Sequence, residues 1–323
     1  MKIALWIILS IIVFSVLVSR FFPGGQGGMM RFIKVASEFA DRDPVIAPDF
    51  SGGGKWLNSE PLTIQALRGK VVVVDFWTYS CINCQRTLPY LRAWWEKYRD
   101  RGLVIIGVHT PEFEFEKDIG NLREAILKYG VTWPVVQDND YRIWTAYSNH
   151  FWPHKYLVDR DGKIVYEHIG EGAYEETERR IQEFLGISDT AVMEEPSSGS
   201  IQFGPSLTPE LYMTSRGQTS SHLGKGRDRV ELLGNWETGE DFSAAGEGAR
   251  LRLVFQASEV NLVMSLPDAR ARTVRVMVDD SESRSLTISS NDLYSLWKGT
   301  FGEHMLVMEV DPGLRIHAFT FGR

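Results

Sequence analysis

The chain has 323 residues, of which 43% are hydrophobic and 24% are charged, and its formal net charge at pH 7 is -7. This length and composition are typical of a globular protein with room for two domains, each with its own core. The acidic balance argues against nucleic acid as a partner. Two cysteines are too few for a disulfide framework or for a zinc site built from four thiolates, so neither a metal nor another cofactor is expected.

Residues 1–22 are expected to form a membrane anchor. An uncharged, mostly apolar stretch runs over residues 3–19, between Lys2 and Arg20, and its length lies at the lower end of the roughly 17 to 25 residues that cross a bilayer as a helix. A cleaved signal peptide is the alternative, although no cleavage signal of small residues follows directly. Basic residues follow the stretch, so charge alone favours a cytoplasmic C-terminal side.

A glycine-rich tether over residues 23–44 and then an α/β domain are expected next. The segment "LRGKVVVVDFW" contains a run of four valines. Such a run is too apolar for a strand in a sheet with one solvent-exposed face. It therefore predicts a strand that is covered on both faces. A second buried strand is expected in "GLVIIGVHT".

Helices and strands alternate up to a hairpin near the end of this domain, which we place at residues 45–186. Apolar side chains at helical spacing, Leu88 to Tyr98 with Trp95 among them, follow the cysteines, and Pro89 inside the pattern predicts a kink. Helices are also expected in "NLREAILKYG" and "YEETERRIQEFLG". Strands are expected in "VTWPVVQDND", "FWPHKYLVD" and "KIVYEHIG".

The composition changes after this domain. Residues 187–207 are expected to form a linker, and short segments with alternating side chains dominate residues 208–323, for example "TVRVMVDD". About seven or eight such strands at short spacing predict an antiparallel β-sandwich. Three aromatic residues of this part could stack on sugar rings, although packing in the core is the more common role: Trp236, Tyr294 and Trp297.

The only two cysteines, Cys81 and Cys84, lie at the junction between the valine-rich strand and the next helix. A C-x-x-C pair in this context is the thioredoxin-type redox arrangement. The first turn of a helix brings the two side chains together, so a disulfide can close and open with little backbone movement. Cys81 would lie at the helix N-terminus, where unpaired N–H groups and the helix dipole favour a thiolate. Two buried core cysteines are the alternative.

The chain resembles the membrane-anchored thioredoxin-like proteins of the TlpA and DipZ type. The segments "LRGKVVVVDFWTYSCINCQRTLPYL" and "GVHTPEFEFEKD" look like the soluble region of DipZ, and the resemblance extends over about residues 45–186. The C-terminal part looks like the small carbohydrate-binding-module-like domain of that family, which implies a sandwich of jelly-roll type. DipZ proteins carry a multi-helix membrane half, in whose place a single helix is expected here.

The resemblance implies roles for four residues. Cys81 matches the exposed nucleophile, and Cys84 matches the buried resolving thiol. Asp75 lies six residues before Cys81, where thioredoxins have a buried acid that takes the proton of the resolving thiol. A carboxylate in an apolar strand should indeed have a raised pKa, although a structural aspartate is the alternative. Pro153 matches the cis-proline that faces the disulfide, with Pro134 as the competing candidate.

Other residues near these positions have weaker signals. Trp77 and Trp152 are candidate substrate contacts, although Trp77 could simply pack. His154 could tune a nearby thiolate, but a surface histidine is the simpler interpretation, and His109 is expected to be a core histidine. Three glutamates alternate with two phenylalanines, which favours a solvated acidic face over a metal site: Glu112, Glu114 and Glu116.

These features predict a membrane-tethered thiol-disulfide oxidoreductase whose residues 23–323 lie on the extracytoplasmic, periplasmic side. A cytosolic glutathione pool would keep a dithiol reduced without a tether, so the compartment is inferred from the thiols against the charge bias. The resemblance favours reduction of protein disulfides. A tether would hold the protein beside a membrane-embedded electron donor, for which the CcdA type is the hypothesis. A disulfide oxidant or isomerase, or a cell-surface glycan-binding protein with a redox-sensing domain, are the alternatives.

Overall fold

The computed structural model describes residues 45–187, 207–213, 222–268, 270–279 and 281–322. The expected membrane anchor and tether lie outside the described residues, and so does most of the expected linker. Among the described residues, none of the helices has the length and apolar character needed to cross a bilayer.

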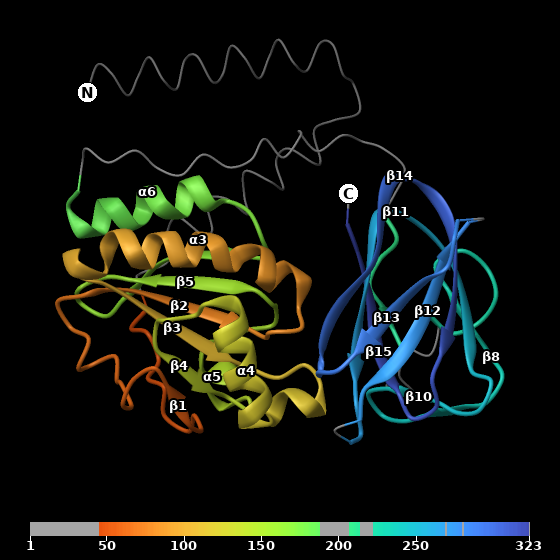
Figure 1. Ribbon diagram of the computed structural model, residues 1–323. Coiled ribbons are helices and arrows are strands. Elements are labelled where there is room, and N and C mark those ends of the chain that lie inside the picture. The colour runs from red at the N-terminus through yellow and green to blue at the C-terminus, as the bar shows by residue number, and fades with distance from the viewer. Residues whose placement is uncertain (1–44, 188–206, 214–221, 269, 280, 323) are drawn as a thin grey trace, which may run out of the picture. The chain divides into compact units, whose positions relative to one another are not determined.

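Residues 45–187 form a six-stranded sheet between helices, as the predicted α/β organisation requires (Figure 1). The strands lie in the order β1 (Trp56–Leu57), β4 (Val135–Gln137), β3 (Leu103–His109), β2 (Val71–Trp77), β5 (His154–Val158) and β6 (Ile164–Ile169). β3 is parallel to β2 and β4, and the other pairs are antiparallel. All seven residues of β2 are buried, because both faces of this central strand are covered.

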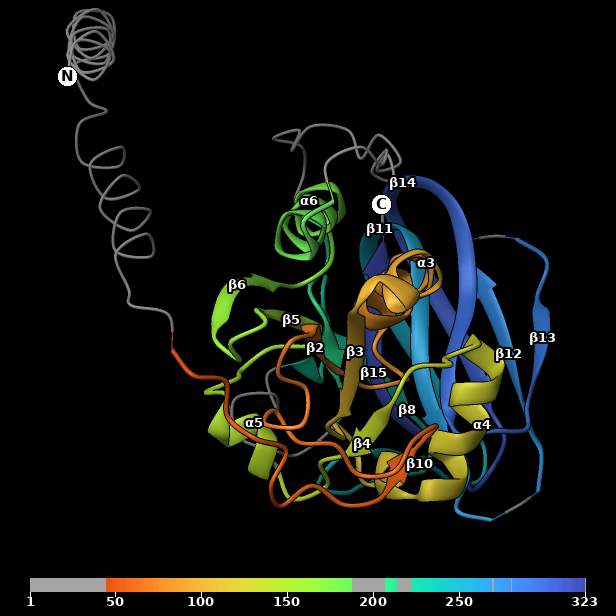
Figure 2. The same cartoon turned by 90° about the vertical axis from the view of Figure 1, so that its left-hand side faces the viewer.

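Three helices cover one face of this sheet: α3 (Ile82–Tyr98), α4 (Ile119–Tyr129) and α6 (Tyr174–Leu185). The short helix α5 (Arg142–Ala146) packs on the other face. α3 and α6 lie on the same side of β2 and β5 in both views (Figure 1, Figure 2). α3 continues through Pro89, and Trp94, rather than the predicted Trp95, is its fully buried tryptophan.

Residues 207–322 form a nine-stranded antiparallel sheet. Its strands are β7 (Leu211–Tyr212), β8 (Val230–Leu233), β9 (Trp236–Thr238), β10 (Ser243–Ala245), β11 (Arg250–Ser265), β12 (Arg272–Val278), β13 (Arg284–Ile288), β14 (Asp292–Val310) and β15 (Arg315–Gly322). The predicted all-β character of this part is confirmed.

The strands expected to form a sandwich are hydrogen-bonded into one continuous sheet, in which the long strands β11 and β14 link most of the others. β11 pairs with β14 along most of its length, with β8 at its beginning and with β15 towards its end. Both ends of β11 contribute to one core, with Leu251 and Leu253 at one end and Leu262 and Met264 at the other. The register shifts after Ala257, as expected where a long strand bends over a core.

Candidate active site

Cys81 and Cys84 lie where β2 leads into α3. Cys81 is the N-cap of α3 and has an extended backbone. Its Sγ accepts a hydrogen bond from the backbone N–H of Cys84 at 3.3 Å, so a sulfur occupies the place of the usual capping oxygen. Both residues are free thiols, with Cys81 partly exposed and Cys84 buried. A partner molecule can therefore reach the sulfur of Cys81 and not that of Cys84.

The Cys84 thiol needs a base in order to ionise near neutral pH. Burial holds its pKa well above the usual value, and the neighbouring Cys81 and Asp75 raise it further. A hydrogen bond with the backbone of Thr78 acts in the opposite direction. An attack by Cys84 on a disulfide therefore needs a nearby proton acceptor.

Asp75 can supply this acceptor. It lies in β2 and is 1% exposed, and its Oδ1 has no hydrogen-bond partner among the described residues. Burial raises its pKa from 3.8 to about 7, although the charge of Lys155 lowers it in part. A carboxyl group with a pKa near neutrality can both accept and release a proton at physiological pH.

Lys155 is a site residue that the sequence did not single out. It lies directly opposite Asp75 in the antiparallel β2–β5 pair, so the two side chains share one face of the sheet. It is 1% exposed, and its Nζ donates a hydrogen bond to the carbonyl of Gly170 at 3.1 Å. Burial lowers its pKa, while Asp75 and Cys84 raise it. The only signal was one lysine within the apolar segment "FWPHKYLVD", because a buried lysine normally needs a partner.

The Trp152–Pro153 peptide bond is cis, and Pro153 leads directly into β5. The indole N–H of Trp152 donates a hydrogen bond to the carbonyl of Thr110 at 3.0 Å. Trp152 also lines a small cavity together with Cys81, where it can touch a substrate. Trp77, in contrast, is 1% exposed and packs in the core beneath α3, so its predicted contact with substrate is wrong.

Two protein families match the two halves of the chain. The AhpC/TSA family matches residues 45–167, and the family described as thioredoxin like C-terminal domain matches residues 210–322. Protein DipZ of Mycobacterium bovis is 33% identical over 308 residues, which cover 85% of this chain and 43% of DipZ. The chain thus resembles thioredoxin-like proteins of the TlpA/DipZ type over both of its halves.

Two further comparisons cover only the thioredoxin-like half. The thiol-disulfide oxidoreductase YkuV of Bacillus subtilis is 28% identical over 142 residues, which are 44% of this chain and 95% of YkuV. The solution structure of a thioredoxin-like protein in the oxidized form is 28% identical, covers 44% of this chain and 96% of that chain, and has a TM-score of 0.41. The chain spans less than half the length of the DipZ protein that it matches.

A buried carboxylate lies beneath the cysteine turn. Glu116 is fully buried, and its Oε1 accepts hydrogen bonds from the hydroxyls of Thr78 at 2.5 Å and Ser80 at 2.6 Å. Its Oε2 accepts from the backbone N–H groups of Glu112 and Phe113. Burial raises the pKa of Glu116, and these hydrogen bonds oppose the shift. The predicted solvated acidic face is therefore wrong for Glu116, because Glu114–Lys117 forms a 3-10 helix, η2, and not an alternating strand.

Two histidines lie close to the site and are buried. His154 is 4% exposed, which corrects the prediction of a surface histidine, and its Nδ1 lies 2.7 Å from Oδ1 of Asn149. Because His154 precedes Lys155 in β5, its side chain points to the opposite face of the sheet from the cysteines. His109 is fully buried, as predicted, and burial lowers its pKa to about 3.

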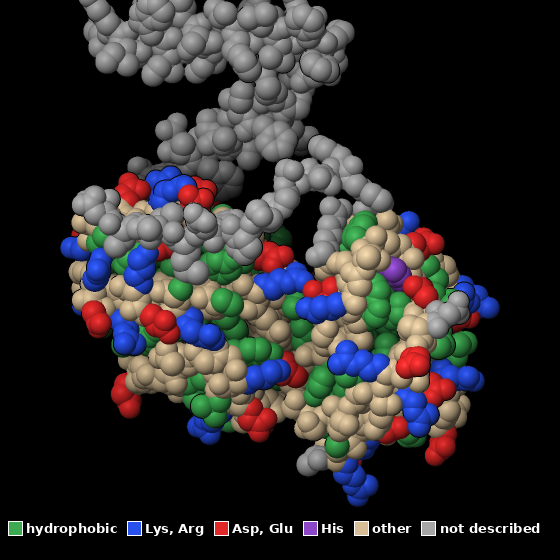
Figure 3. Space-filling view, turned by 45° about the horizontal axis from the view of Figure 1, so that its top comes forward, with side chains coloured by type: hydrophobic (Ala, Val, Ile, Leu, Met, Phe, Trp, Pro, Cys, Tyr) green, Lys and Arg blue, Asp and Glu red, His purple; other side chains and the backbone are tan. Residues whose placement is uncertain are grey.

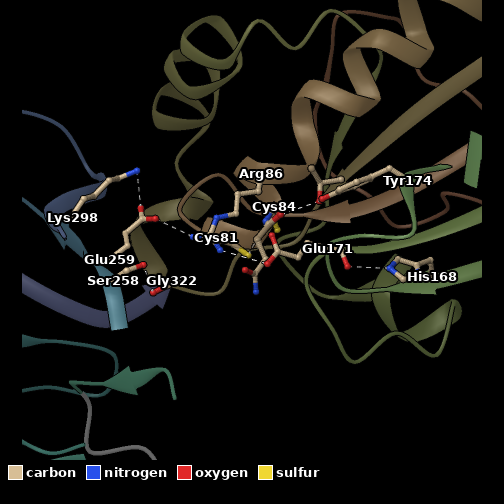
Figure 4. Close-up of polar contacts among 12 residues, drawn as sticks. Cys81, Cys84, Arg86, His168, Glu171, Tyr174, Ser258, Glu259, Lys298 and Gly322 are labelled. Carbon is tan, nitrogen blue, oxygen red and sulfur yellow. Dashed lines mark hydrogen bonds and ion pairs between the residues drawn. The ribbon is translucent and has the colours of Figure 1, made fainter. Parts of the chain in front are cut away.

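The C-terminal sheet contacts the thioredoxin-like half next to the cysteines. Arg86 of α3 lies between Glu171 at 3.5 Å and Glu259 of β11 at 3.3 Å, and Lys298 of β14 pairs with Glu259 at 3.2 Å (Figure 4). Basic and acidic side chains lie together where the two halves meet (Figure 3). Such contacts join segments far apart in the sequence, so no local pattern could have predicted them.

An apolar cluster completes this contact. Phe113 packs with Val263 of β11 and Ala318 of β15. Tyr212 of β7 donates a hydrogen bond to Oε1 of Glu112 at 2.5 Å. The loop before η2 thus connects the cysteine turn, through Glu116, with three strands of the C-terminal sheet.

Proposed function

We propose that this protein is a membrane-tethered oxidoreductase that reduces protein disulfides outside the cytoplasm. The observation that carries the proposal is the asymmetric dithiol. Cys81 is accessible, whereas Cys84 is buried with Asp75 as a nearby carboxyl of pKa about 7. One sulfur can therefore attack a partner, and the other is placed to resolve the product.

The reaction follows from these positions. The Cys81 thiolate attacks a substrate disulfide, one S–S bond breaks, and a mixed disulfide forms while the first substrate sulfur leaves as a thiolate. Asp75 then accepts the proton of Cys84, whose sulfur attacks Cys81 and releases the second substrate thiolate. The substrate gains two electrons, and Cys81 and Cys84 end as a disulfide. Lys155 lies next to Asp75 and Cys84, and its charged form favours the ionised form of either group.

The resemblance to TlpA-type proteins favours the reducing direction. A dithiol becomes a strong oxidant when its reduced form is stabilised, so the reduction potential tests this direction. A disulfide oxidant or isomerase is the alternative. A measurement of the reduction potential distinguishes it from a reductant.

We further propose that residues 1–22 hold the protein at the membrane and that a membrane-embedded donor of the CcdA type supplies electrons. A reductant outside the cytoplasm needs delivered electrons, and a tether raises its effective concentration near such a donor towards the millimolar range. Glycan binding is not part of the proposal, because Trp236, Tyr294 and Trp297 pack against the core of the C-terminal sheet.

Two measurements test this function. The full-length protein should reduce insulin, and its potential should lie near the roughly -270 mV of thioredoxin rather than the roughly -120 mV of DsbA. A potential near the second value would refute the reducing direction. In intact cells, a membrane-impermeant maleimide should label Cys81 after mild reduction, and labelling only after lysis would refute the location.

A further inference from the structure

A small cavity lies beside Cys81, and both halves of the described chain line it. Its volume is about 50 Å³, which gives room for about three to five water molecules at roughly 10 to 15 Å³ each. Trp152 lines it on the thioredoxin-like side, and Val263 and Ala318 add apolar surface from the C-terminal sheet. The cavity can therefore hold the end of one substrate side chain next to the reactive sulfur.

The charged groups of this lining are all acidic. Glu112 and Glu210 line the cavity, and its lining includes no lysine, arginine or histidine. Glu112 is partly buried and Glu210 is exposed. Neither carboxylate forms an ion pair within the part of the chain that the structure describes.

A single hydroxyl group serves both carboxylates. The Tyr212 hydroxyl lies 2.5 Å from Oε1 of Glu112 and 3.2 Å from Oε2 of Glu210, but it has only one hydrogen to donate. The pKa of Glu112 is raised to about 8, mainly by burial, with the Tyr212 hydrogen bond opposing the rise and the nearby Glu116 and Glu210 adding to it. The pair thus lacks a positive partner, and the Tyr212 hydroxyl can donate to only one of its two carboxyl groups at a time.

Thr320 gives an independent indication of a missing ligand. It lines the same cavity and is 5% exposed, and its Oγ1 has no hydrogen-bond partner in the described ranges. Buried polar groups are normally paired. A ligand that brings N–H donors into the cavity would satisfy this hydroxyl, which can accept as well as donate.

We propose that the cavity binds a lysine or arginine side chain that flanks the target cysteine of a substrate, so that the C-terminal sheet selects disulfides with a basic neighbour. This inference rests on the proposed function, because the substrate must present its disulfide to Cys81. An ammonium or guanidinium group supplies donors for Glu112, Glu210 and Thr320. The apolar stem of the same side chain packs on Val263 and Ala318.

Two disulfide peptides that differ in one side chain test this selection. One carries lysine beside its cysteine, and the other carries norleucine, which keeps the stem and lacks the ammonium group. The pre-reduced full-length protein reacts with each peptide in a single turnover, which is followed by the loss of protein thiols. We expect the lysine peptide to react about tenfold faster, as charge-assisted hydrogen bonds in a partly exposed site allow.

Three variants test whether the preference for the lysine peptide arises in the cavity. Glu210→Gln should reduce the preference to about twofold, and Ala318→Leu should abolish it by filling the cavity. Glu282→Gln removes the same charge from an exposed position outside the cavity, so it should keep the full preference and control for the net charge of the protein.

The outcomes separate the two proposals. Equal rates for the two peptides, with both reduced, would overturn the cavity proposal and leave the proposed function intact. A lysine preference that persists in Glu210→Gln and Ala318→Leu would also overturn it. Failure to reduce either peptide and bis(2-hydroxyethyl) disulfide, a small uncharged substrate, would instead overturn the proposed function.

Discussion

Replacement of Asp75 by asparagine should stabilise the fold at neutral pH and slow disulfide exchange at the same time. Asparagine keeps the shape of the side chain but can neither ionise nor accept the proton of Cys84. Asp75 is 1% exposed, and its Oδ1 makes no hydrogen bond with the described residues. The substitution therefore removes a buried ionisable group and leaves the hydrogen bonding of that oxygen unchanged.

The gain in stability follows from the pKa of Asp75. Burial raises this pKa from 3.8 to about 7, with Lys155 lowering it in part, and a shift of about 3 units corresponds to about 4 kcal/mol. Between about pH 4 and pH 7 the native state binds more protons than the unfolded state, so the stability of the wild type falls as pH rises. In Asp75→Asn this contribution to the pH dependence of the free energy of unfolding is absent. The variant's free energy of unfolding should therefore exceed that of the wild type by up to about 4 kcal/mol above pH 7 and match it near pH 4.

The rate of disulfide exchange should fall in Asp75→Asn, whereas the stability of the fold should rise. A positioned general base contributes roughly 10²-fold to 10⁴-fold to proton transfer, so resolution of the mixed disulfide by Cys84 should slow at least about tenfold at pH 7. In the wild type this rate should rise with pH through the pKa of Asp75 at about 7. In the variant this rise should disappear.

Urea denaturation at several pH values measures the free energy of unfolding, and rapid acid quenching measures the rate of resolution. Asp100→Asn is the matched control, since its side chain is 91% exposed, and it should change stability by less than about 0.5 kcal/mol. If Asp75→Asn is less stable than the wild type at pH 7.5, or retains the rise in rate, Asp75 is a structural residue and the assignment as a base fails.

Four further substitutions examine the remaining parts of the site. Cys84→Ser should trap mixed disulfides with partner proteins on non-reducing gels, whereas Cys81→Ser should not, because only the first sulfur is accessible. Lys155→Met should move the pH midpoint of resolution upwards by about one unit, because the charge that lowers the pKa of Asp75 is lost. Glu116→Ala should lower the free energy of unfolding by about 3 kcal/mol or more, since it leaves four buried donors without their acceptor.

Each of these substitutions has a contradicting result. Equal trapping by both cysteine variants would refute their distinct roles. An unchanged pH midpoint in Lys155→Met would mean that this lysine does not act on Asp75. For Glu116→Ala the control is Glu114→Ala, an exposed neighbour in η2, and an equal loss of stability in both would show that the buried hydrogen bonds do not contribute.

The sequence predicted the features that depend on local patterns. The four valines predicted a fully buried strand, and β2 is buried at all seven positions. The C-x-x-C spacing predicted a pair at a helix N-terminus, and Cys81 is the N-cap of α3. Both signals lie within one strand or one helical turn, so they do not depend on where the rest of the chain lies.

Features that depend on distant segments were missed. The pairing of Lys155 with Asp75 follows from the antiparallel register between β2 and β5, which no local pattern encodes. The burial of Glu116 follows from the 3-10 helix that turns it towards Thr78 and Ser80. The second wall of the cavity comes from the C-terminal sheet, whose position beside the cysteines is a tertiary property.

One incorrect prediction could have been avoided by applying the strand period to all residues of β2. Side chains two positions apart in a strand point to the same face of the sheet. Asp75 had to face the helix that carries Cys84, because a base must lie near the thiol that it serves. Trp77 therefore had to face this helix too, and it is indeed buried in that core. A buried base at Asp75 and an exposed substrate contact at Trp77 were incompatible, and the substrate surface had to come from elsewhere, namely from Trp152 and the C-terminal sheet.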